Sequence, residues 1–553
     1  MRLLSSRLAM SDGDMSMDCQ RGTSASTSSC FMRSRILGDI LLSEKLLSKL
    51  LGVTVTVIKG GIVVDTEPQP VVLGRVDVRI EDGRIAAVGP DLANGTGVGN
   101  GTGVGGERTG GERTGREGIG GDKAVGGTVC GERGGGRAVG GERGGREGSG
   151  GGGGGQSVGT REAGGRGVDG EEVEVVDASG MIVLPGFVDS HRHTWQAGIR
   201  AVVPDTTFDG YLRRIIRELA PAYRPEDVHA GNLAGALECL GAGITTLLDW
   251  SHVQFTPEHT DAAVRALRES GIRAVFGYCH GGPPERLAEE GRRVHDVHFG
   301  TTGLLSMVIA AMGPEIAGPE VALREWRLAR DLDLPVTAHL GGHGPRSATE
   351  GLAFLADNGL FGPRTTYVHA NHYTDDQLKA IAGSGGNVSV SPIDEMGLGI
   401  GYPITGRALA AGLPTSLSID TVACSPGDMF SLMRAAFAME RGRPDGQGMG
   451  FDTRDALRIA TIEGARVVGL GDEVGSLRPG KQADLVLLRT DTLGMAAAYD
   501  PIGAVVLNAD TSAVDTVLVA GRVVKRGGRL LHHDVTEVLA ALAESARAVT
   551  TVR

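Results

Sequence analysis

Residues 181–196 of this chain read MIVLPGFVDSHRHTWQ. An apolar run leads into His191, Arg192 and His193, which close the segment before a polar stretch begins. Side chains two residues apart on a strand project to the same face, so His191 and His193 can reach one metal ion while Arg192 points away. Enzymes built on parallel α/β barrels place their chemistry at the ends of such strands. The segment therefore predicts a buried barrel strand that ends in two metal ligands.

From this strand to about Gly469, short apolar segments alternate with helical stretches. About eight β/α units over roughly 280 residues fit a closed (β/α)8 TIM barrel better than an open sheet. The seven strands expected after the first are TTLLDW (245–250), RAVFGY (273–278), LLSMVIAA (304–311), PVTAHL (335–340), TTYVHA (365–370), NVSVS (387–391) and PTSLSID (414–420).

The segments on both sides of the barrel alternate apolar and polar residues, which is typical of half-buried strands. Three C-terminal segments return to this pattern: ADLVLL (483–488), AVVLNAD (504–510) and VDTVLVAGRVVKRGGRL (514–530). We therefore predict an α/β protein with a small composite β-sandwich built from the N- and C-terminal flanks. The expected organisation is an N-terminal extension, disordered or with one short helix (1–52), the first part of the sandwich (53–92 and 171–185), a glycine-rich disordered insertion (93–170), the barrel (186–469), the second part of the sandwich (470–531) and a C-terminal helix or tail (532–553).

Composition limits the functional classes. The 55 Lys and Arg residues against 67 Asp and Glu residues give a net charge of −12, which argues against a nucleic-acid binder, since that needs a basic face. No apolar run approaches the roughly 18–20 residues of a membrane span. The six cysteines are scattered without a CxxC pair, which favours a reducing cytoplasm and argues against a disulfide scaffold. We expect a cytoplasmic protein with a small-molecule substrate and no nucleic-acid or membrane partner.

Three further polar residues end predicted barrel strands: His339, His369 and Asp420. A lone histidine at a strand end is more often structural than a ligand, but here the whole set falls at strand ends. Three imidazoles, one carboxylate and an open position for water form a reasonable catalytic zinc or iron site.

The chain resembles the amidohydrolase superfamily, in the cytosine deaminase and chlorohydrolase-like branch that includes S-adenosylhomocysteine deaminase-like enzymes. The resemblance covers about residues 53–531 apart from the glycine-rich stretch, and it implies the same barrel with a composite sandwich. It also suggests a homo-oligomer. The segments that carry it are LPGFVDSHRHTWQ, GITTLLD, ESGIRAVF, YVHANHYTDDQL, LSIDTVACSPGDMF and ATIEGARVVGLGDEVGSLRPGKQADLVLL.

Carried over residue by residue, the resemblance makes His191, His193, His339 and Asp420 the metal ligands. It gives His369 contact with the substrate and with the attacking water. Relatives with two metals bridge them through a carboxylated lysine or a substitute on strand 4, and LLSMVIAAMGPE contains no lysine. One divalent ion is therefore expected, Zn²⁺ first and Fe²⁺ as the alternative.

The mechanism that follows is hydrolysis by metal-bound hydroxide. A bound ion lowers the pKa of its water from 15.7 towards ~7, and the resulting hydroxide attacks an electrophilic sp² carbon. Asp420 is expected to take the proton and pass it on, and His369 to stabilise the developing charge.

Other pocket residues rest on weaker signals. Gln196 matches a glutamine that purine- and triazine-directed relatives use on the substrate ring, although an ordinary loop residue is the alternative. Trp195 is expected to stack on a planar substrate or to plug the barrel mouth. His343 is a third candidate for substrate binding, with a purely structural role as the alternative.

The sequence departs from the branch at two positions. Related deaminases place a proton-shuttling glutamate three residues after the strand-5 histidine, where this chain has Gly342. The strand-4 motif usually carries a histidine after Gly-Pro, where this chain has Glu315. Glu315 is the first candidate for a replacement catalytic acid, with a solvated loop carboxylate as the alternative, and His343 is the second.

We therefore predict a mononuclear metal-dependent amidohydrolase that hydrolyses a non-peptide carbon–nitrogen bond in a small cyclic or amidine-type substrate, by deamination of an N-heterocycle. One alternative is a related hydrolase that releases a group other than ammonia or opens a cyclic amide. The other alternative is a metal-free, non-enzymatic scaffold protein.

The glycine-rich segment itself allows a test. Replacing residues 93–170 by a short turn should leave metal content and activity intact, because the closure cost of a loop grows only slowly with its length. Metal analysis and an activity assay of the soluble deletion variant check this. Loss of soluble protein on deletion would contradict the interpretation.

Overall fold

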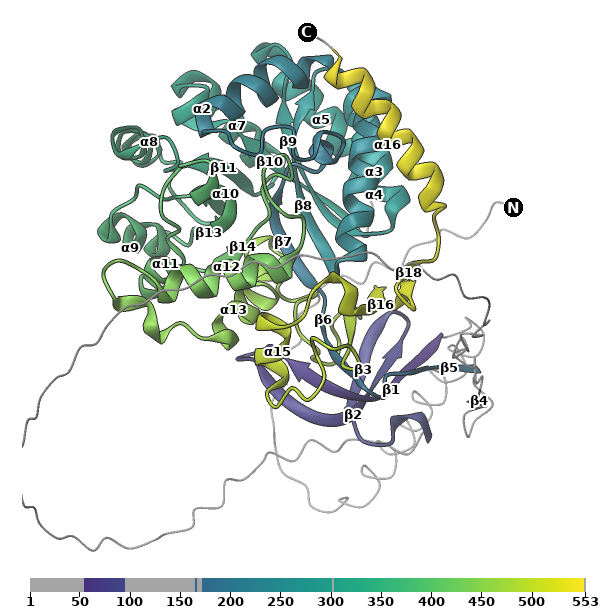
Figure 1. Cartoon of the computed structure of the whole chain (residues 1–553). Coiled ribbons are helices and arrows are strands. Elements are labelled where there is room, and N and C mark those ends of the chain that lie inside the picture. Colours follow the sequence, from purple (N-terminus) through teal and green to yellow (C-terminus); the bar gives the residue numbers. More distant parts are fainter. Residues whose placement is uncertain (1–53, 95–164, 167–171, 301–302, 552–553) are drawn as a thin grey trace, which may run out of the picture.

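The computed structural model of the protein describes residues 54–94, 165–166, 172–300 and 303–551 (Figure 1). The predicted N-terminal extension and most of the glycine-rich insertion lie outside these residues. Both ends of the insertion are described: a 3-10 turn, η1 (Leu92–Asn94), precedes it, and a short strand, β4 (Gly165–Arg166), lies near its end. A deletion confined to residues 95–164 would leave both elements in place.

Eight parallel strands form the barrel and pair in sequence order, as the sequence predicts. The first strand is joined to the segment that follows the last strand by a parallel bridge between Arg192 and Asp420. The Asp420 amide donates to the His191 carbonyl at 2.9 Å, and the His193 amide donates to the Asp420 carbonyl at 2.8 Å. The strands are β7 (Phe187–Arg192), β8 (Ile244–Gln254), β9 (Arg273–His280), β10 (Leu305–Ala311), β11 (Val336–Leu340), β12 (Thr365–His369), β13 (Asn387–Val390) and β14 (Thr415–Leu417).

Helices alternate with these strands and surround the barrel (Figure 1). Their first turns often carry proline, which suits a position whose amide has no partner inside the helix. The longer helices are α3 (Pro225–Gly241), α4 (Pro257–Ser270), α5 (Leu287–His298), α7 (Pro319–Asp331), α8 (Pro345–Asp357), α9 (Asp375–Gly383) and α12 (Met429–Arg441). Shorter segments are η2 (Thr194–Ile199), α2 (Phe208–Tyr211), the π-helical η3 (Leu212–Leu219), η4 (Ala220–Ala222), η5 (Pro284–Arg286), α6 (Gly313–Ile316), α10 (Pro392–Gly397), α11 (Thr405–Ala410), η6 (Gln447–Gly450), α13 (Thr453–Ile459) and α14 (Ile462–Val467).

The two flanks combine into a separate sheet next to the barrel (Figure 1). The first part of β1 pairs in parallel with β5 and its second part with β6, while β6 pairs antiparallel with β15 and so joins the N- and C-terminal flanks. The remaining strands of this ten-stranded sheet extend from those pairs. In addition to β4, the sheet contains β1 (Val55–Asp65), β2 (Val71–Glu81), β3 (Arg84–Gly89), β5 (Glu172–Asp177), β6 (Met181–Pro185), β15 (Leu485–Arg489), β16 (Val514–Val519), β17 (Arg522–Arg526) and β18 (Arg529–Leu530).

One predicted strand is wrong. The segment AVVLNAD (504–510) lies partly in a helix, α15 (Pro501–Leu507), and not in the sheet. The Asp500 side chain accepts a hydrogen bond from the Ile502 amide at 3.0 Å, and Pro501 occupies the first turn, so the helix start is well defined. A short apolar run does not distinguish a strand from a buried helix, and the helix-start residues before it decide the outcome.

The described chain ends in helix α16 (Val535–Thr550), which lies alongside α3 at the barrel surface (Figure 1). A short η7 turn (Thr511–Ala513) precedes β16. Among the described residues, no helix combines the length and the apolar character needed to span a membrane.

A buried ion pair connects the barrel to the sheet. Arg273, on β9, donates two hydrogen bonds to the Asp484 carboxylate at 2.9 and 3.0 Å, and both side chains are buried. The same carboxylate accepts a hydrogen bond from the Ala520 amide at 2.8 Å, in the turn between β16 and β17. Asp484 therefore holds together three segments that are distant in the sequence.

We expect Asp484→Ala to lower the free energy of unfolding by about 3–5 kcal/mol, because it removes the hydrogen-bonded partner of the buried Arg273 charge and leaves only the half-exposed Glu473 carboxylate at 4.0 Å. Urea denaturation followed by circular dichroism measures the effect. Asp491→Ala is the matched control, since it breaks the exposed Arg489–Asp491 pair and should change stability by less than about 0.5 kcal/mol. Equal effects of the two substitutions would contradict a structural role for the buried pair.

Candidate metal centre

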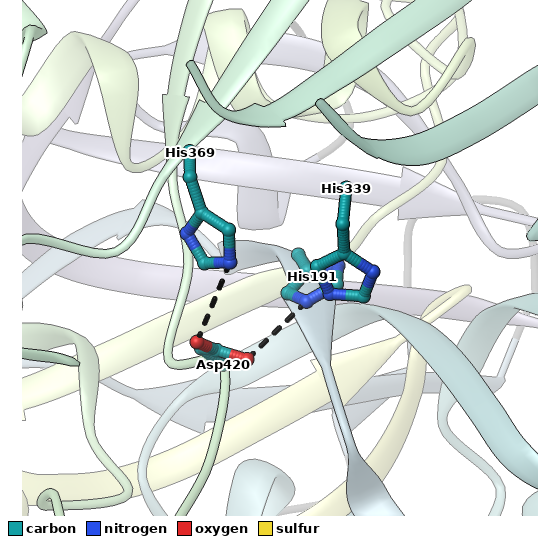
Figure 2. Close-up of side chains that lie close together, drawn as sticks. All are labelled: His191, His339, His369 and Asp420. Carbon is teal, nitrogen blue, oxygen red and sulfur yellow. Dashed lines mark ion pairs between the residues drawn. The ribbon is translucent and has the colours of Figure 1, made fainter. Parts of the chain in front are cut away.

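The Asp420 carboxylate is the centre of a buried polar cluster at the barrel mouth (Figure 2). Its Oδ1 lies 3.3 Å from His191 Nε2 and 3.2 Å from His193 Nε2, and its Oδ2 lies 3.8 Å from His369 Nε2. Asp420 and His369 both have left-handed backbone conformations, with φ of 63° and 74°. Such values are uncommon for residues other than glycine, and they turn both side chains as their strands end.

Four residues in the described part of the chain form a group that can hold a metal ion: His191, His339, His369 and Asp420. Their candidate ligand atoms all lie within 4.8 Å of one another, and Figure 2 shows the side chains converging. Both ring nitrogens of His191 are buried without a hydrogen-bond partner among the described residues, which is costly unless something else binds there. The donor set of imidazole nitrogen and carboxylate oxygen fits a divalent transition metal.

The charge states also suit a metal site. Burial lowers the pKa of His191 to about 4 and that of His339 well below its usual range, so both imidazoles are neutral at pH 7. Burial alone would raise the pKa of Asp420, but the neighbouring imidazoles of His191, His193 and His369 outweigh it and hold this pKa well below its usual range. Neutral imidazoles and an ionised carboxylate are the forms that bind metals.

His193 is oriented by the backbone. Its Nδ1 lies 2.8 Å from the Trp250 carbonyl oxygen, which can only accept, so Nδ1 carries the proton. The lone pair is then on Nε2, the atom that faces Asp420. A ring nitrogen held in this way by a carbonyl is a common support for a metal-ligating histidine.

His369 is oriented by a residue that the sequence analysis did not identify. The buried Glu395 places Oε1 at 3.3 Å from His369 Nδ1, and its Oε2 accepts a hydrogen bond from Asn371 at 3.0 Å. Burial opposes protonation of His369, but the hydrogen bond with Glu395 and the charge of Asp420 outweigh it and raise the pKa of His369. The signal available in the sequence was the acidic pair Asp394-Glu395 directly after the seventh barrel strand.

A cavity of about 220 Å³ opens onto this cluster. Its polar end is formed by five histidines and Asp420, and its other walls are largely apolar. The segment between β7 and α3, including α2 and η3, supplies much of the apolar wall. The lining residues are His193, Phe208, Tyr211, Leu212, Ile216, Arg217, His252, Met312, Ile316, His339, His343, His369, Leu398 and Asp420.

Two of the residues predicted to bind substrate lie behind the wall of this cavity. Gln196 is fully buried, donates to the Tyr211 hydroxyl at 2.7 Å and accepts from Thr421, so its amide is already occupied. Trp195 is fully buried and packs edge-on against Tyr223 at 4.8 Å between ring centroids. Neither side chain lines the cavity, because the η2 turn directs both into the protein interior.

The two candidates for a catalytic acid differ in position. His343 follows β11 and lines the cavity. Glu315, on α6, is buried and does not line it, since its Oε1 accepts a hydrogen bond from the Gly341 amide at 2.8 Å. His252 also lines the cavity, with its ring centroid 4.1 Å from that of His193.

Comparisons with known proteins agree with this architecture. Residues 182–524 match the amidohydrolase family. A 5-methylthioadenosine/S-adenosylhomocysteine deaminase from Desulforudis audaxviator is 30% identical over 398 residues, which are 68% of this chain and 89% of that protein.

Two solved structures share the fold over nearly all of their own length. An adenosine deaminase from Xanthomonas campestris with bound zinc has a TM-score of 0.70 at 21% identity, and the match covers 90% of this chain and 99% of that one. Atrazine chlorohydrolase from Arthrobacter aurescens, complexed with zinc, has a TM-score of 0.69 at 20% identity, with 89% and 100% covered.

Two sets of metal ligands are compatible with this geometry, because His193 and His369 both face Asp420. Each set contains His191, His339 and Asp420, with either His193 or His369 as the fourth ligand. We expect His191→Ala, His193→Ala and Asp420→Ala to lose most bound metal, because each removes a ligand atom. His369→Ala should keep its metal, because Glu395 already engages its ring. Elemental analysis of purified variants measures the difference.

The control is His229→Ala, since His229 lies at the surface beside Glu269 and should not affect metal content. If His369→Ala lost its metal while His193→Ala kept it, His369 would be the metal ligand and His193 would not.

Proposed function

The chain belongs to the amidohydrolase family, and from this premise we propose that it removes ammonia from an amino-substituted N-heterocycle in a reaction that depends on one divalent metal ion. As a family member it is a hydrolase that acts on carbon–nitrogen bonds other than peptide bonds. The observation that carries the proposal is the juxtaposition of a buried His/Asp cluster with an apolar cavity of ring size.

His191, His193, His339 and Asp420 are the residues that would hold the ion. Three imidazole nitrogens and one carboxylate oxygen favour Zn²⁺, with Fe²⁺ as the alternative. A divalent ion bound there lowers the pKa of a coordinated water from 15.7 towards ~7 and so supplies a nucleophile at neutral pH. The zinc in the structure of the Xanthomonas adenosine deaminase supports this choice.

Asp420 and His369 then have complementary roles. Asp420 is ionised and is the base that accepts a proton from the attacking water. His369 is held by Glu395 with its Nε2 towards Asp420, so it can donate a hydrogen bond to the negative charge that develops at the attacked carbon. Both side chains are buried, and the low local dielectric strengthens these interactions.

The cavity sets limits on the substrate. At about 220 Å³ it is smaller than the roughly 300–1,000 Å³ of typical ligand pockets, which favours a single compact ring system. Phe208, Leu212 and Met312 offer apolar surface to the faces and edges of such a ring. In such a complex, the reacting carbon and its amino group would sit beside the cluster of imidazoles that lines one end of the cavity.

A related hydrolase that releases a different group is the second candidate function. Gly342 has no side chain at the position where related deaminases carry their proton-shuttling glutamate, and chloride needs no proton to leave. Release of a non-ammonia group, or opening of a cyclic amide, is therefore the outcome to test beside deamination. The homo-oligomeric state suggested by the sequence stays a prediction.

We expect ammonia release from at least one compound in a panel of aminopurines, adenosine-type nucleosides, aminopyrimidines, aminotriazines and aminopterins. Removal of the metal by a chelator should abolish this activity, and added Zn²⁺ should restore it, because the metal activates the water. Ammonia is measured with a coupled assay and the organic product by mass spectrometry.

Two other results would count against the proposal. Chloride release from the chloro analogues without ammonia release from the amino compounds would favour the second candidate function. Purified protein that binds no zinc, iron or manganese after expression with these metals would favour a non-enzymatic scaffold.

A further inference from the structure

His343 is a cavity-facing imidazole outside the candidate metal centre. It lies four residues beyond His339, in the loop between β11 and α8, and lines the cavity together with His339, His369 and Asp420. Its side chain is 18% exposed, so it is neither sealed in the core nor free in solvent. The Phe208 ring packs edge-on against it at 5.3 Å between centroids, which limits its rotation.

The other side of the His343 ring meets a buried carboxylate. Its Nδ1 is buried and lies 3.5 Å from Glu315 Oε2, an ion-pair distance, and neither atom has a hydrogen-bond partner among the described residues. Among the described residues, His343 is the one basic side chain within 4.0 Å of the Glu315 carboxylate. With Nδ1 directed at Glu315, Nε2 is the ring nitrogen left to meet a ligand in the cavity.

Glu315 is held firmly in this position. Its side chain is fully buried, and Oε1 accepts the Gly341 amide at 2.8 Å. Gly351, on α8, packs so closely that a β-carbon there would lie 2.8 Å from Glu315 Cγ. Burial and the nearby Glu315 charge raise the pKa of Tyr373 well above its usual range, so the Tyr373 hydroxyl stays neutral beside Glu315.

From this geometry we propose that His343 is the catalytic acid that protonates the leaving nitrogen, and that Glu315 is the positioning residue behind it. The inference rests on the proposed deamination. An imidazole is a common general acid in enzymes, and a carboxylate facing one ring nitrogen fixes the orientation of the ring and leaves the other nitrogen for the substrate.

The proposed step is a hydrolysis at the ring carbon that carries the amino group. Water adds to the ring carbon and gives one proton to Asp420, a carbon–oxygen bond forms, and the carbon–nitrogen bond to the amino group breaks. His343 Nε2 gives a proton to the departing nitrogen, which leaves as ammonia. Asp420 returns its proton to solvent and His343 takes one back, so one water is consumed and one ammonia is released.

The neighbouring residues do not replace His343 in this role. Glu315 itself does not line the cavity, and Gly342 has no side chain. Arg217 lines the cavity, but a guanidinium does not give up a proton in proteins and cannot act as a catalytic acid. Burial raises the pKa of Tyr211 well above its usual range, which makes its hydroxyl a weaker acid than an imidazole.

Gly342 provides a way to test the assignment. A β-carbon at this position would lie 3.6 Å from His369 Cδ2, which is ordinary van der Waals contact, and the backbone is not left-handed. The site therefore has room for a side chain that starts beside His369. Gly342→Glu would place a carboxylic acid next to the reacting centre, independent of His343.

The experiment compares one amino-heterocycle that the enzyme deaminates with its chloro counterpart, using metal-loaded protein. In His343→Ala and His343→Gln we expect kcat for the amino compound to fall by about 10²–10⁴-fold, with KM and metal content unchanged. The rate with the chloro compound should change by less than about tenfold, because chloride leaves without a proton. Glu315→Gln should show the same leaving-group dependence with a smaller fall in kcat.

Two rescue measurements complete the test. Added imidazole should raise the rate of His343→Ala with the amino compound only, and Gly342→Glu combined with His343→Ala should recover part of the lost kcat. His229→Ala, at the surface, is the control that should leave all rates unchanged.

Each contrary result has a distinct meaning. An amino-compound rate near wild type in both His343 variants would overturn the assignment and leave the proposed deamination standing. Equal losses with the amino and chloro compounds, without rescue by imidazole, would give His343 a structural role and likewise overturn it. A wild-type enzyme that binds metal but deaminates no compound would overturn the proposed function, and this inference would fall with it.

Discussion

A single buried carboxylate, that of Asp420, connects the fold of this protein to its chemistry. Its backbone closes the barrel through hydrogen bonds with His191 and His193, and its side chain faces the imidazoles of His191, His193 and His369. A charge buried in this way is stable only when other groups compensate it. The backbone hydrogen bonds that close the barrel also bring Asp420 beside His191 and His193, so closure of the barrel positions part of the candidate metal centre.

One part of the barrel interior carries small polar side chains that contact one another. Ser190, on β7, contacts the hydroxyls of Ser389 and Ser416 at 2.8 and 2.6 Å, and Ser389 donates to Ser418 at 2.8 Å. These small side chains link β7, β13 and the segment around β14, the strands next to the point of closure. A satisfied network of this kind favours one arrangement of the strands, because a shifted register would leave several hydroxyls buried without partners.

Two imidazoles at the cavity are each contacted by a buried carboxylate on the side away from the cavity. Glu395 stands behind His369, and Glu315 stands behind His343, in each case with the carboxylate buried and the imidazole facing the cavity. Each carboxylate is itself fixed by a backbone amide, from Ser391 and Gly341 respectively. A third imidazole, that of His193, is oriented by a backbone carbonyl instead. Ring orientation here depends on groups that no substrate touches.

Strand periodicity and the placement of polar residues at strand ends are local properties, so the amino-acid sequence predicts the barrel, the flanking sheet and the residue types of the candidate metal centre. It did not decide which side chains beyond the strand ends face the cavity. Gln196 and Trp195 turn into the interior, Glu395 supports His369, and η3 forms a wall, all through contacts with segments far away in the chain. The helix at Pro501–Leu507 was also only partly predictable. Its apolar run fits a strand or a buried helix, and the Asp500 cap together with packing favours the helix. Side-chain direction in a loop is set by the neighbours that the fold supplies, and only the tertiary structure contains them.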